Sequence, residues 1–257
     1  MFLIRWYAVF LLLVLGACTG SRRIAGAFAI HEDSLILVDT VRNRSIPLAL
    51  YLPVAAGRIP HQQVVIFSHG YNANEPGANR SYTYLTRYLA AHGYAVVSIQ
   101  HELPGDSLLP TTGIPQVVRR TNWERGVMNI RYVMEALPGH FPQLDYSHLT
   151  LIGHSNGGDM SMLFGHLHPQ LVHTIISLDN RRMPLPRTTQ PRIYSLRADE
   201  FPADEGVIPP PSDLLRYGIH IVLLKGVKHN DMSDSGKPRQ HRKINRQVLK
   251  WLEPEGR

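Results

Sequence analysis

The chain has 257 residues, of which 44% are hydrophobic and 18% are charged. These values are typical of one globular domain with a full core, and they exclude a disordered chain. The 20 glycines and 19 prolines are scattered without a period, which excludes collagen and low-complexity structures. The net charge of +7 raises the question of an anionic partner, either nucleic acid or a membrane surface.

The N-terminus has the features of an export signal. Arg5 precedes an unbroken apolar run over residues 6–15, and this run is too short to cross a bilayer as a helix of about 20 residues. Residues 15–18, Leu-Gly-Ala-Cys ending at Cys18, are similar to the lipobox of bacterial lipoproteins. We therefore expect residues 1–17 to be a lipoprotein-type signal peptide, with a plain signal peptide and free secretion as the alternative.

Cys18 is the only cysteine, so an internal disulfide framework and a cysteine zinc site are excluded. We expect Cys18 to be lipidated and residues 18–33 to link the lipid anchor to a domain over residues 34–257. The residue after the cysteine is Thr19, whereas an aspartate at this position would favour a different membrane. By resemblance to Gram-negative lipoproteins, this predicts attachment to the outer membrane, facing the periplasm.

Part of the positive charge is local. Six Lys and Arg residues lie between positions 237 and 250, and apolar residues recur there at helical spacing: Ile244, Val248, Trp251 and Leu252. The pattern predicts a final amphipathic helix with a solvated basic face. We prefer this interpretation to nucleic-acid binding, because an exported chain meets anionic lipid headgroups more readily than DNA.

Extended and helical segments alternate along the chain, which is typical of an α/β fold with crossover helices. Eight extended segments predict a large open sheet: 35–38, 46–52, 64–68, 94–99, 149–152, 174–178, 193–196 and 219–224. Apolar residues from Trp123 to Leu137 repeat every three or four positions and predict an amphipathic helix; a second is indicated around residues 85–89. The loop from Glu102 to Thr121 is long and rich in Pro and Gly, so we expect it to line a site.

The strongest chemical signal is the sequence Gly-His-Ser-Asn-Gly at residues 153–157. It matches G-x-S-x-G, follows a predicted strand and precedes a small-residue helical segment. That arrangement predicts a nucleophile elbow, in which flanking glycines permit a tight turn and Ser155 stands above the sheet.

A serine hydroxyl needs a base, and His229 follows the last predicted strand by a short loop. The group His166, His168 and His173 lacks a nearby acidic or cysteine partner, so we expect no metal site there. We interpret His220, inside the last strand, as a packing residue.

An oxyanion hole needs two backbone donors. We expect one to be the amide of Asn156, directly after Ser155. The other is expected at Tyr71, because the strand 64–68 ends in His69-Gly70 and Gly70 lets the backbone turn.

These motifs resemble the α/β-hydrolase superfamily and, within it, bacterial relatives of the platelet-activating-factor acetylhydrolases. The resemblance covers most of the chain from about Asp39. It includes five ordered segments: Phe67 to Gly70, Leu89 to Tyr94 with a strand ending in His101, Gly153 to Gly158, Leu178-Asp179 with Pro184, and His229 to Asp231 with Asp234. It implies an α/β-hydrolase fold with a mostly parallel eight-stranded sheet flanked by helices. It also implies a metal-independent serine esterase, without cofactor, acting on short acyl esters through an acyl-enzyme.

The acid that would orient His229 has two candidates in the chain order serine, acid, histidine. Asp179 follows the strand 174–178 and falls where the acetylhydrolases keep their acid, whereas Asp199 follows the next strand, the commoner superfamily position. The resemblance favours Asp179, and Asp204 ranks behind both. Asn180-Arg181-Arg182 departs from the apolar residues of those enzymes, which puts a phospholipid substrate in doubt.

The sequence thus predicts an esterase with the triad Ser155, Asp179 and His229. Because fold alone does not prove activity, a lipid-anchored binding protein on the same scaffold is the alternative from another class. Peptidase or acyltransferase chemistry with the same triad also stays open.

Overall fold

Eight strands form one sheet in the structure, a computed structural model that describes residues 28–55 and 59–253. The spatial order is β1-β2-β4-β3-β5-β6-β7-β8. β2 runs antiparallel to β1 and β4, and all other neighbouring strands are parallel. The strand bounds are β1 Ala29–Asp39, β2 Arg44–Val54, β3 Gln63–Ser68, β4 Ala95–Ile99, β5 Asp145–His154, β6 Thr174–Leu178, β7 Arg192–Ala198 and β8 His220–Leu224. The predicted eight-stranded, mostly parallel sheet is confirmed.

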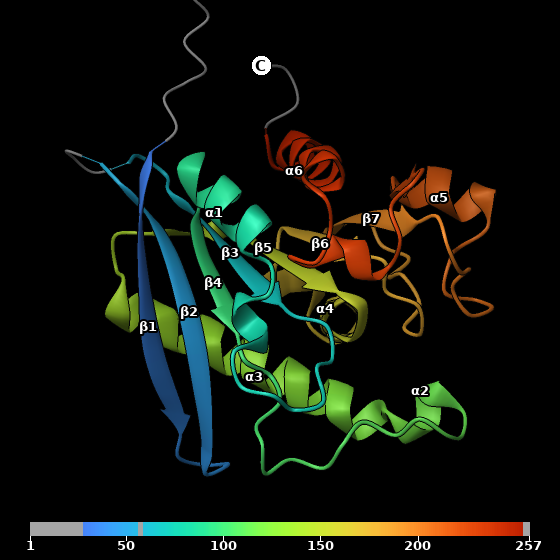
Figure 1. Ribbon diagram of the computed structural model, residues 1–257, viewed down its shortest axis with the longest axis horizontal. Coiled ribbons are helices and arrows are strands. Elements are labelled where there is room, and N and C mark those ends of the chain that lie inside the picture. Colours follow the sequence, from blue (N-terminus) through green and yellow to red (C-terminus); the bar gives the residue numbers. More distant parts are fainter. Residues whose placement is uncertain (1–27, 56–58, 254–257) are drawn as a thin grey trace, which may run out of the picture.

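Helices cover both faces of this sheet (Figure 1). Their bounds are α1 Thr83–Ala91, α2 Pro115–Val118, α3 Arg120–His140, α4 Ser155–Leu167, α5 Pro211–Tyr217 and α6 Pro238–Leu252. Buried residues of α3 and α4 form one core with the sheet, and those of α1 and α6 form the other. β3 shows how one strand serves both: Val64 and Ile66 lie in the first core, Val65 and Phe67 in the second. Such continuous apolar strands are typical of parallel sheets buried on both faces.

The edge strand β1 begins at Ala29, six residues before the predicted start. It pairs with β2 over its whole length, from Ala29 opposite Val54 to Asp39 opposite Arg44. The expected boundary at residue 34 therefore falls inside this hairpin. The predictions for the signal peptide and for Cys18 concern residues 1–27, which lie outside the described residues. In residues 28–55 and 59–253, no helix combines the length and apolar character needed to span a bilayer.

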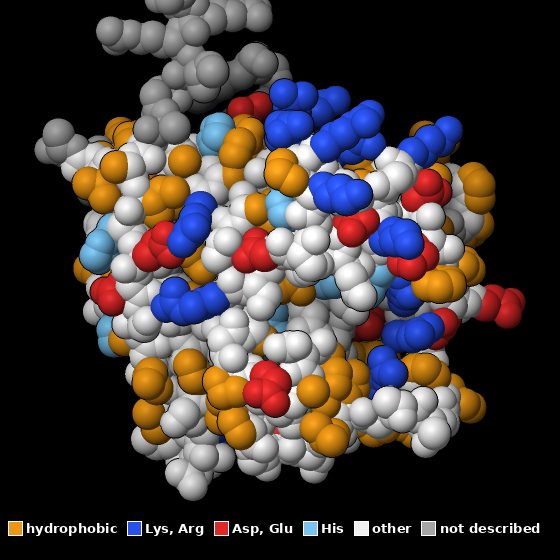
Figure 2. Space-filling model, viewed as in Figure 1, with side chains coloured by type: hydrophobic (Ala, Val, Ile, Leu, Met, Phe, Trp, Pro, Cys, Tyr) orange, Lys and Arg blue, Asp and Glu red, His pale blue; other side chains and the backbone are white. Residues whose placement is uncertain are grey.

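The predicted final amphipathic helix is α6. Its apolar residues Ile244, Val248, Trp251 and Leu252 are buried, while Arg239, Arg242, Arg246 and Lys250 are exposed. Figure 2 shows Lys and Arg side chains gathered over this region. The expectation for His220 was wrong: its side chain is exposed at the start of β8, where its ring stacks on Tyr194.

The parallel strands β3, β5, β6 and β8 all end at the same edge of the sheet, because parallel strands share one direction. The loops that follow them carry Gly70, Ser155, Asp179 and His229 respectively. The sheet topology thus brings four segments that are distant in sequence to one place. Crevices at the carboxyl ends of such strands are where open α/β sheets bind ligands.

Candidate active site

Ser155 lies on a sharp turn between β5 and α4. Its backbone has φ 51°, a left-handed conformation that is rare for a residue with a side chain. The glycines beside it are required by space: a Cβ at Gly153 would lie 2.3 Å from the carbonyl oxygen of Gly157, and one at Gly157 would lie 2.3 Å from that of Ser68. The strand, turn and helix predicted as a nucleophile elbow are present.

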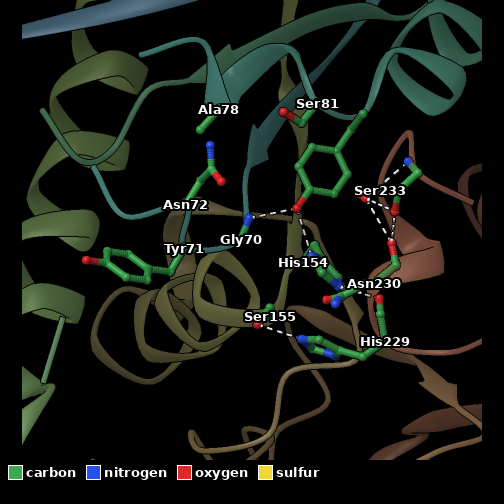
Figure 3. A pocket seen from close by; sticks show the side chains of 12 residues that line it. Gly70, Tyr71, Asn72, Ala78, Ser81, His154, Ser155, His229, Asn230 and Ser233 are labelled. Atoms are coloured by element: carbon green, nitrogen blue, oxygen red, sulfur yellow. Dashed lines mark hydrogen bonds between the residues drawn. The ribbon is translucent and has the colours of Figure 1, made fainter. Parts of the chain in front are cut away.

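His229 connects Ser155 to Asp179. Its Nε2 lies 2.9 Å from Ser155 Oγ (Figure 3), and its Nδ1 lies 2.6 Å from Asp179 Oδ2. Asp199 is elsewhere: its carboxylate accepts a hydrogen bond from the Gly226 amide. Asp204 pairs with Arg182. Of the three acidic candidates, the fold brings Asp179 to the imidazole.

Asp179 is fully buried and is surrounded by donors. Besides His229, it accepts a hydrogen bond from the Ala198 amide at 3.0 Å and lies 3.1 Å from Arg181 Nη2 and 3.2 Å from Arg197 Nη2. Burial alone would raise the pKa of this carboxyl. The hydrogen bond from His229 and the charge of Arg197 outweigh burial and lower the pKa to about 2. Neither arginine could be assigned a role at the site from the sequence.

The charge on Asp179 determines which nitrogen of the neutral His229 imidazole carries the proton. An ionised carboxylate can only accept, so His229 donates from Nδ1, and Nε2 is left to accept from the hydroxyl of Ser155. The three groups therefore form a directed chain from hydroxyl to carboxylate. Such a chain can remove the proton of Ser155 as its oxygen attacks an electrophile.

The loop after β3 lies directly over Ser155. A Cβ at Gly70 would come 3.4 Å from Ser155 Cβ and 2.8 Å from His154 Nδ1. His69 donates from Nδ1 to the Gly70 carbonyl at 2.7 Å, and carbonyl and amide point in opposite directions across a trans peptide. The Tyr71 amide therefore points away from His69, and it has no acceptor among the described residues. The Asn156 amide is in the first turn of α4, where helical N–H groups lack an acceptor within the helix.

His154 is the residue between Gly153 and Ser155 in the G-x-S-x-G motif. Its side chain connects the Gly70 loop to the His229 loop. Its Nε2 lies 3.0 Å from the His229 carbonyl oxygen, which can only accept, so Nε2 carries the proton. Its Nδ1 then accepts from the Tyr82 hydroxyl at 2.7 Å, and the Tyr82 oxygen accepts from the Gly70 amide at 2.9 Å. Burial and the neighbouring His229 lower the pKa of His154 to about 3, so the ring stays neutral. A hydrogen-bonded chain thus runs from the Gly70 loop to the His229 loop.

The side chain of Asn156 is held by a second buried network. Its Oδ1 accepts from Trp123 Nε1 at 2.8 Å, and its Nδ2 donates to Asn122 Oδ1 at 2.9 Å and to Glu102 Oε1 at 3.1 Å. These contacts tie the start of α4 to α3 and to the chain after β4. Neither this network nor the Tyr82 chain could be anticipated from sequence, because its members are brought together only by packing.

A cavity of about 450 Å³ opens in front of Ser155. The expectation that the loop from Glu102 to Thr121 lines the site was wrong, because no cavity-lining residue comes from it. The Tyr71 ring turns away from Ser155 (Figure 3), and its hydroxyl accepts from the Leu109 amide of that loop. The lining comes mostly from the segments 70–82 and 229–235. Within the described ranges, no group of three His, Cys, Asp or Glu side chains could hold a metal ion.

Solved structures with similar folds include several esterases and a putative dienelactone hydrolase of Klebsiella pneumoniae. Esterase Est22 is 13% identical, with a TM-score of 0.63 and coverage of 87% of this chain and 81% of that one. An esterase of Rhizomucor miehei is 14% identical (TM-score 0.63, coverage 89% and 84%). A hyperthermophilic esterase of the archaeon Pyrobaculum calidifontis is 15% identical (TM-score 0.62, coverage 88% and 84%). At these identities the likeness shows the fold, which together with the nucleophile elbow defines an α/β-hydrolase.

The family follows from the sequence. The family model described as chlorophyllase matches residues 25–204, well over half of the chain. No curated protein sequence matches this chain. The chain belongs to the chlorophyllase family, and the predicted superfamily is confirmed.

Proposed function

We propose that this α/β-hydrolase is a serine carboxylesterase that cleaves esters of short acyl groups through an acyl-enzyme. The proposal rests on one observation: Ser155, His229 and Asp179 form a hydrogen-bonded chain with contacts of 2.9 and 2.6 Å beside a solvent-open cavity. Esterases among the structures of similar fold support the same reaction class.

In the acylation step, His229 Nε2 takes the proton of Ser155 while Oγ attacks the ester carbonyl. The amides of Tyr71 and Asn156 donate to the oxyanion of the tetrahedral intermediate. Asp179 supports the imidazolium, which then protonates the leaving alcohol. In deacylation a water molecule replaces the alcohol: His229 takes its proton, the hydroxide attacks the acyl carbon, and Ser155 leaves with the proton returned.

The cavity supports a short acyl group. Of its twelve lining residues, Ala78 carries the only aliphatic side chain. A long hydrocarbon chain would find little apolar surface there, and burial of apolar surface is what drives such binding.

The test is the reaction of the purified protein with p-nitrophenyl acetate and with a fluorophosphonate probe, which labels only an activated serine. We expect both in the wild type and neither in Ser155→Ala. Ser212→Ala removes an exposed hydroxyl from α5 and should change neither. A folded wild type without hydrolysis or labelling would contradict the proposal and favour a binding protein on the same scaffold.

We further propose that the enzyme is anchored by lipid at Cys18 in the outer membrane, facing the periplasm. The exposed cations of α6 suit a nearby anionic lipid surface, and in the described residues none of them has an acidic partner. Metabolic labelling with radioactive palmitate should mark the wild type and spare Cys18→Ala. Equal labelling of both would overturn the anchor.

A further inference from the structure

The wall of the cavity away from Ser155 is made of neutral hydrogen-bonding side chains. Figure 3 shows Asn72 and Ser233 on opposite sides of the pocket, with Ser81 between them and Asn230 between Ser233 and His229. Ser235 completes the lining on the same side. Two segments supply these groups: residues 72–81 follow β3, and residues 230–235 follow the candidate base.

These side chains offer both donors and acceptors to a ligand. Asn72, Ser81 and Asn230 line the cavity, and Asn72 and Asn230 are exposed to solvent. Their side chains form no hydrogen bond with another described residue, so their amide and hydroxyl groups are open to a ligand. The Ser233 and Ser235 hydroxyls each lie 2.8 Å from the Asn230 carbonyl oxygen and 2.9 Å from each other, and Ser233 Oγ also accepts from the Ser235 amide at 3.3 Å. Their hydrogens are used within this segment, so toward a ligand these two hydroxyls can only accept. A ligand group that both donates and accepts, as a hydroxyl does, matches this set.

The lining also excludes other ligand classes. None of the twelve residues is Lys, Arg, Asp or Glu, and His154 is neutral because it is buried beside His229. A phosphate or ammonium group would therefore lose its hydration without meeting a countercharge. A hydrocarbon would leave the polar groups of the wall unsatisfied, which is costly in the same way.

The direction of the reaction shows which half of the ester meets this wall. His229 must protonate the oxygen of the leaving alcohol, so that oxygen lies beside the imidazole. The chain runs on from His229 into Asn230, Ser233 and Ser235. The alcohol half therefore extends toward the polar wall, while the acyl carbon stays at Ser155 under the Gly70 loop.

We propose that the natural substrate is a short-acyl ester of a neutral polyhydroxylated alcohol, bound through its hydroxyls by Asn72, Ser81 and the segment 230–235. This inference rests on the proposed esterase function and specifies its substrate class. Sugar and glycerol esters share the required chemistry.

Three acetates that share one acyl group test this. Methyl 6-O-acetylglucoside and cyclohexylmethyl acetate both carry a six-membered ring on the CH2–O of the ester, and differ chiefly in the ring hydroxyls; glyceryl monoacetate is the third substrate. We expect kcat/KM to be at least tenfold higher for one of the hydroxylated esters than for the cyclohexylmethyl ester, mainly through KM. The better of the two distinguishes a sugar from a glycerol ester.

Variants of the wall give a second readout. Asn72→Ala and Ser81→Ala should each reduce that preference about fivefold, the value of one neutral hydrogen bond. Ser212→Ala on α5 should leave the preference unchanged. An equal or higher kcat/KM for the cyclohexylmethyl ester would overturn the inference while leaving the esterase intact. Absence of hydrolysis together with absence of fluorophosphonate labelling would instead remove the proposed function, and the inference with it.

Discussion

Tyr82→Phe tests whether the chain from Gly70 to His229 contributes to catalysis. The Tyr82 oxygen links the Gly70 amide, at 2.9 Å, to His154 Nδ1, at 2.7 Å. Phenylalanine fills the same space but leaves both groups buried without a partner. Each unsatisfied group costs about 1–3 kcal/mol, so the loss of both should lower the free energy of unfolding by about 2–6 kcal/mol.

The substitution should also lower kcat, and by more than a loss of stability alone would do in a protein that is still folded. Without its anchor the Gly70 loop can shift, so the Tyr71 amide, the proposed oxyanion donor, no longer points directly at the oxyanion. Loss of a complete oxyanion donor costs about 100- to 1,000-fold in kcat. A displaced donor should therefore lower kcat about 10- to 100-fold, with KM changed little because the ground-state contacts remain.

Steady-state hydrolysis of p-nitrophenyl acetate by Tyr82→Phe provides the measurement, with chemical denaturation to confirm that the variant is folded under assay conditions. The matched control is Tyr146→Phe, which removes a hydroxyl that donates to the Phe141 carbonyl at 3.0 Å, remote from the site. A Tyr82→Phe enzyme that is destabilised but keeps kcat within threefold of wild type would refute the reasoning. In that case the chain would stabilise the fold without positioning the catalytic groups.

Three further predictions concern the acid and the loop. Asp179→Asn should lower kcat about 10,000-fold by favouring the wrong imidazole tautomer, whereas Asp199→Asn keeps an acceptor for the Gly226 amide and should stay within threefold; the reverse order in the same ester assay would reassign the acid. The pKa of Asp179 falls from 3.8 to about 2 on folding, so its contribution of about 2 kcal/mol is complete above about pH 5 and is lost progressively as the pH falls to about 1. Urea unfolding across that range should show the loss in the wild type, and an equal slope in Asp179→Asn would contradict it. Gly70→Ala places a Cβ 2.8 Å from His154 Nδ1, so it should lower kcat at least tenfold in a folded protein; unchanged kcat would show that the loop tolerates displacement.

Local sequence determined the elements of this fold and two of the groups in the candidate triad. Apolar residues at spacings of three and four predicted the helices α3 and α6, and short apolar runs predicted the strands. The nucleophile elbow was readable because its requirement is local: glycines must flank Ser155 where the turn leaves no room for a Cβ. His229 could be proposed because it follows the last strand, at an edge where parallel strands end together.

The tertiary structure alone decided what surrounds those groups. Asp179 and Asp199 each follow a strand of the same sheet, and only the paths of the loops bring the first to His229 and turn the second to Gly226. Arg181, Arg197 and Tyr82 are ordinary residues in the sequence, and each acts at the site through contacts with segments that the fold brings beside it. A hydrogen bond depends on distance and direction within a few tenths of an ångström, and those quantities exist only once the helices have packed on the sheet.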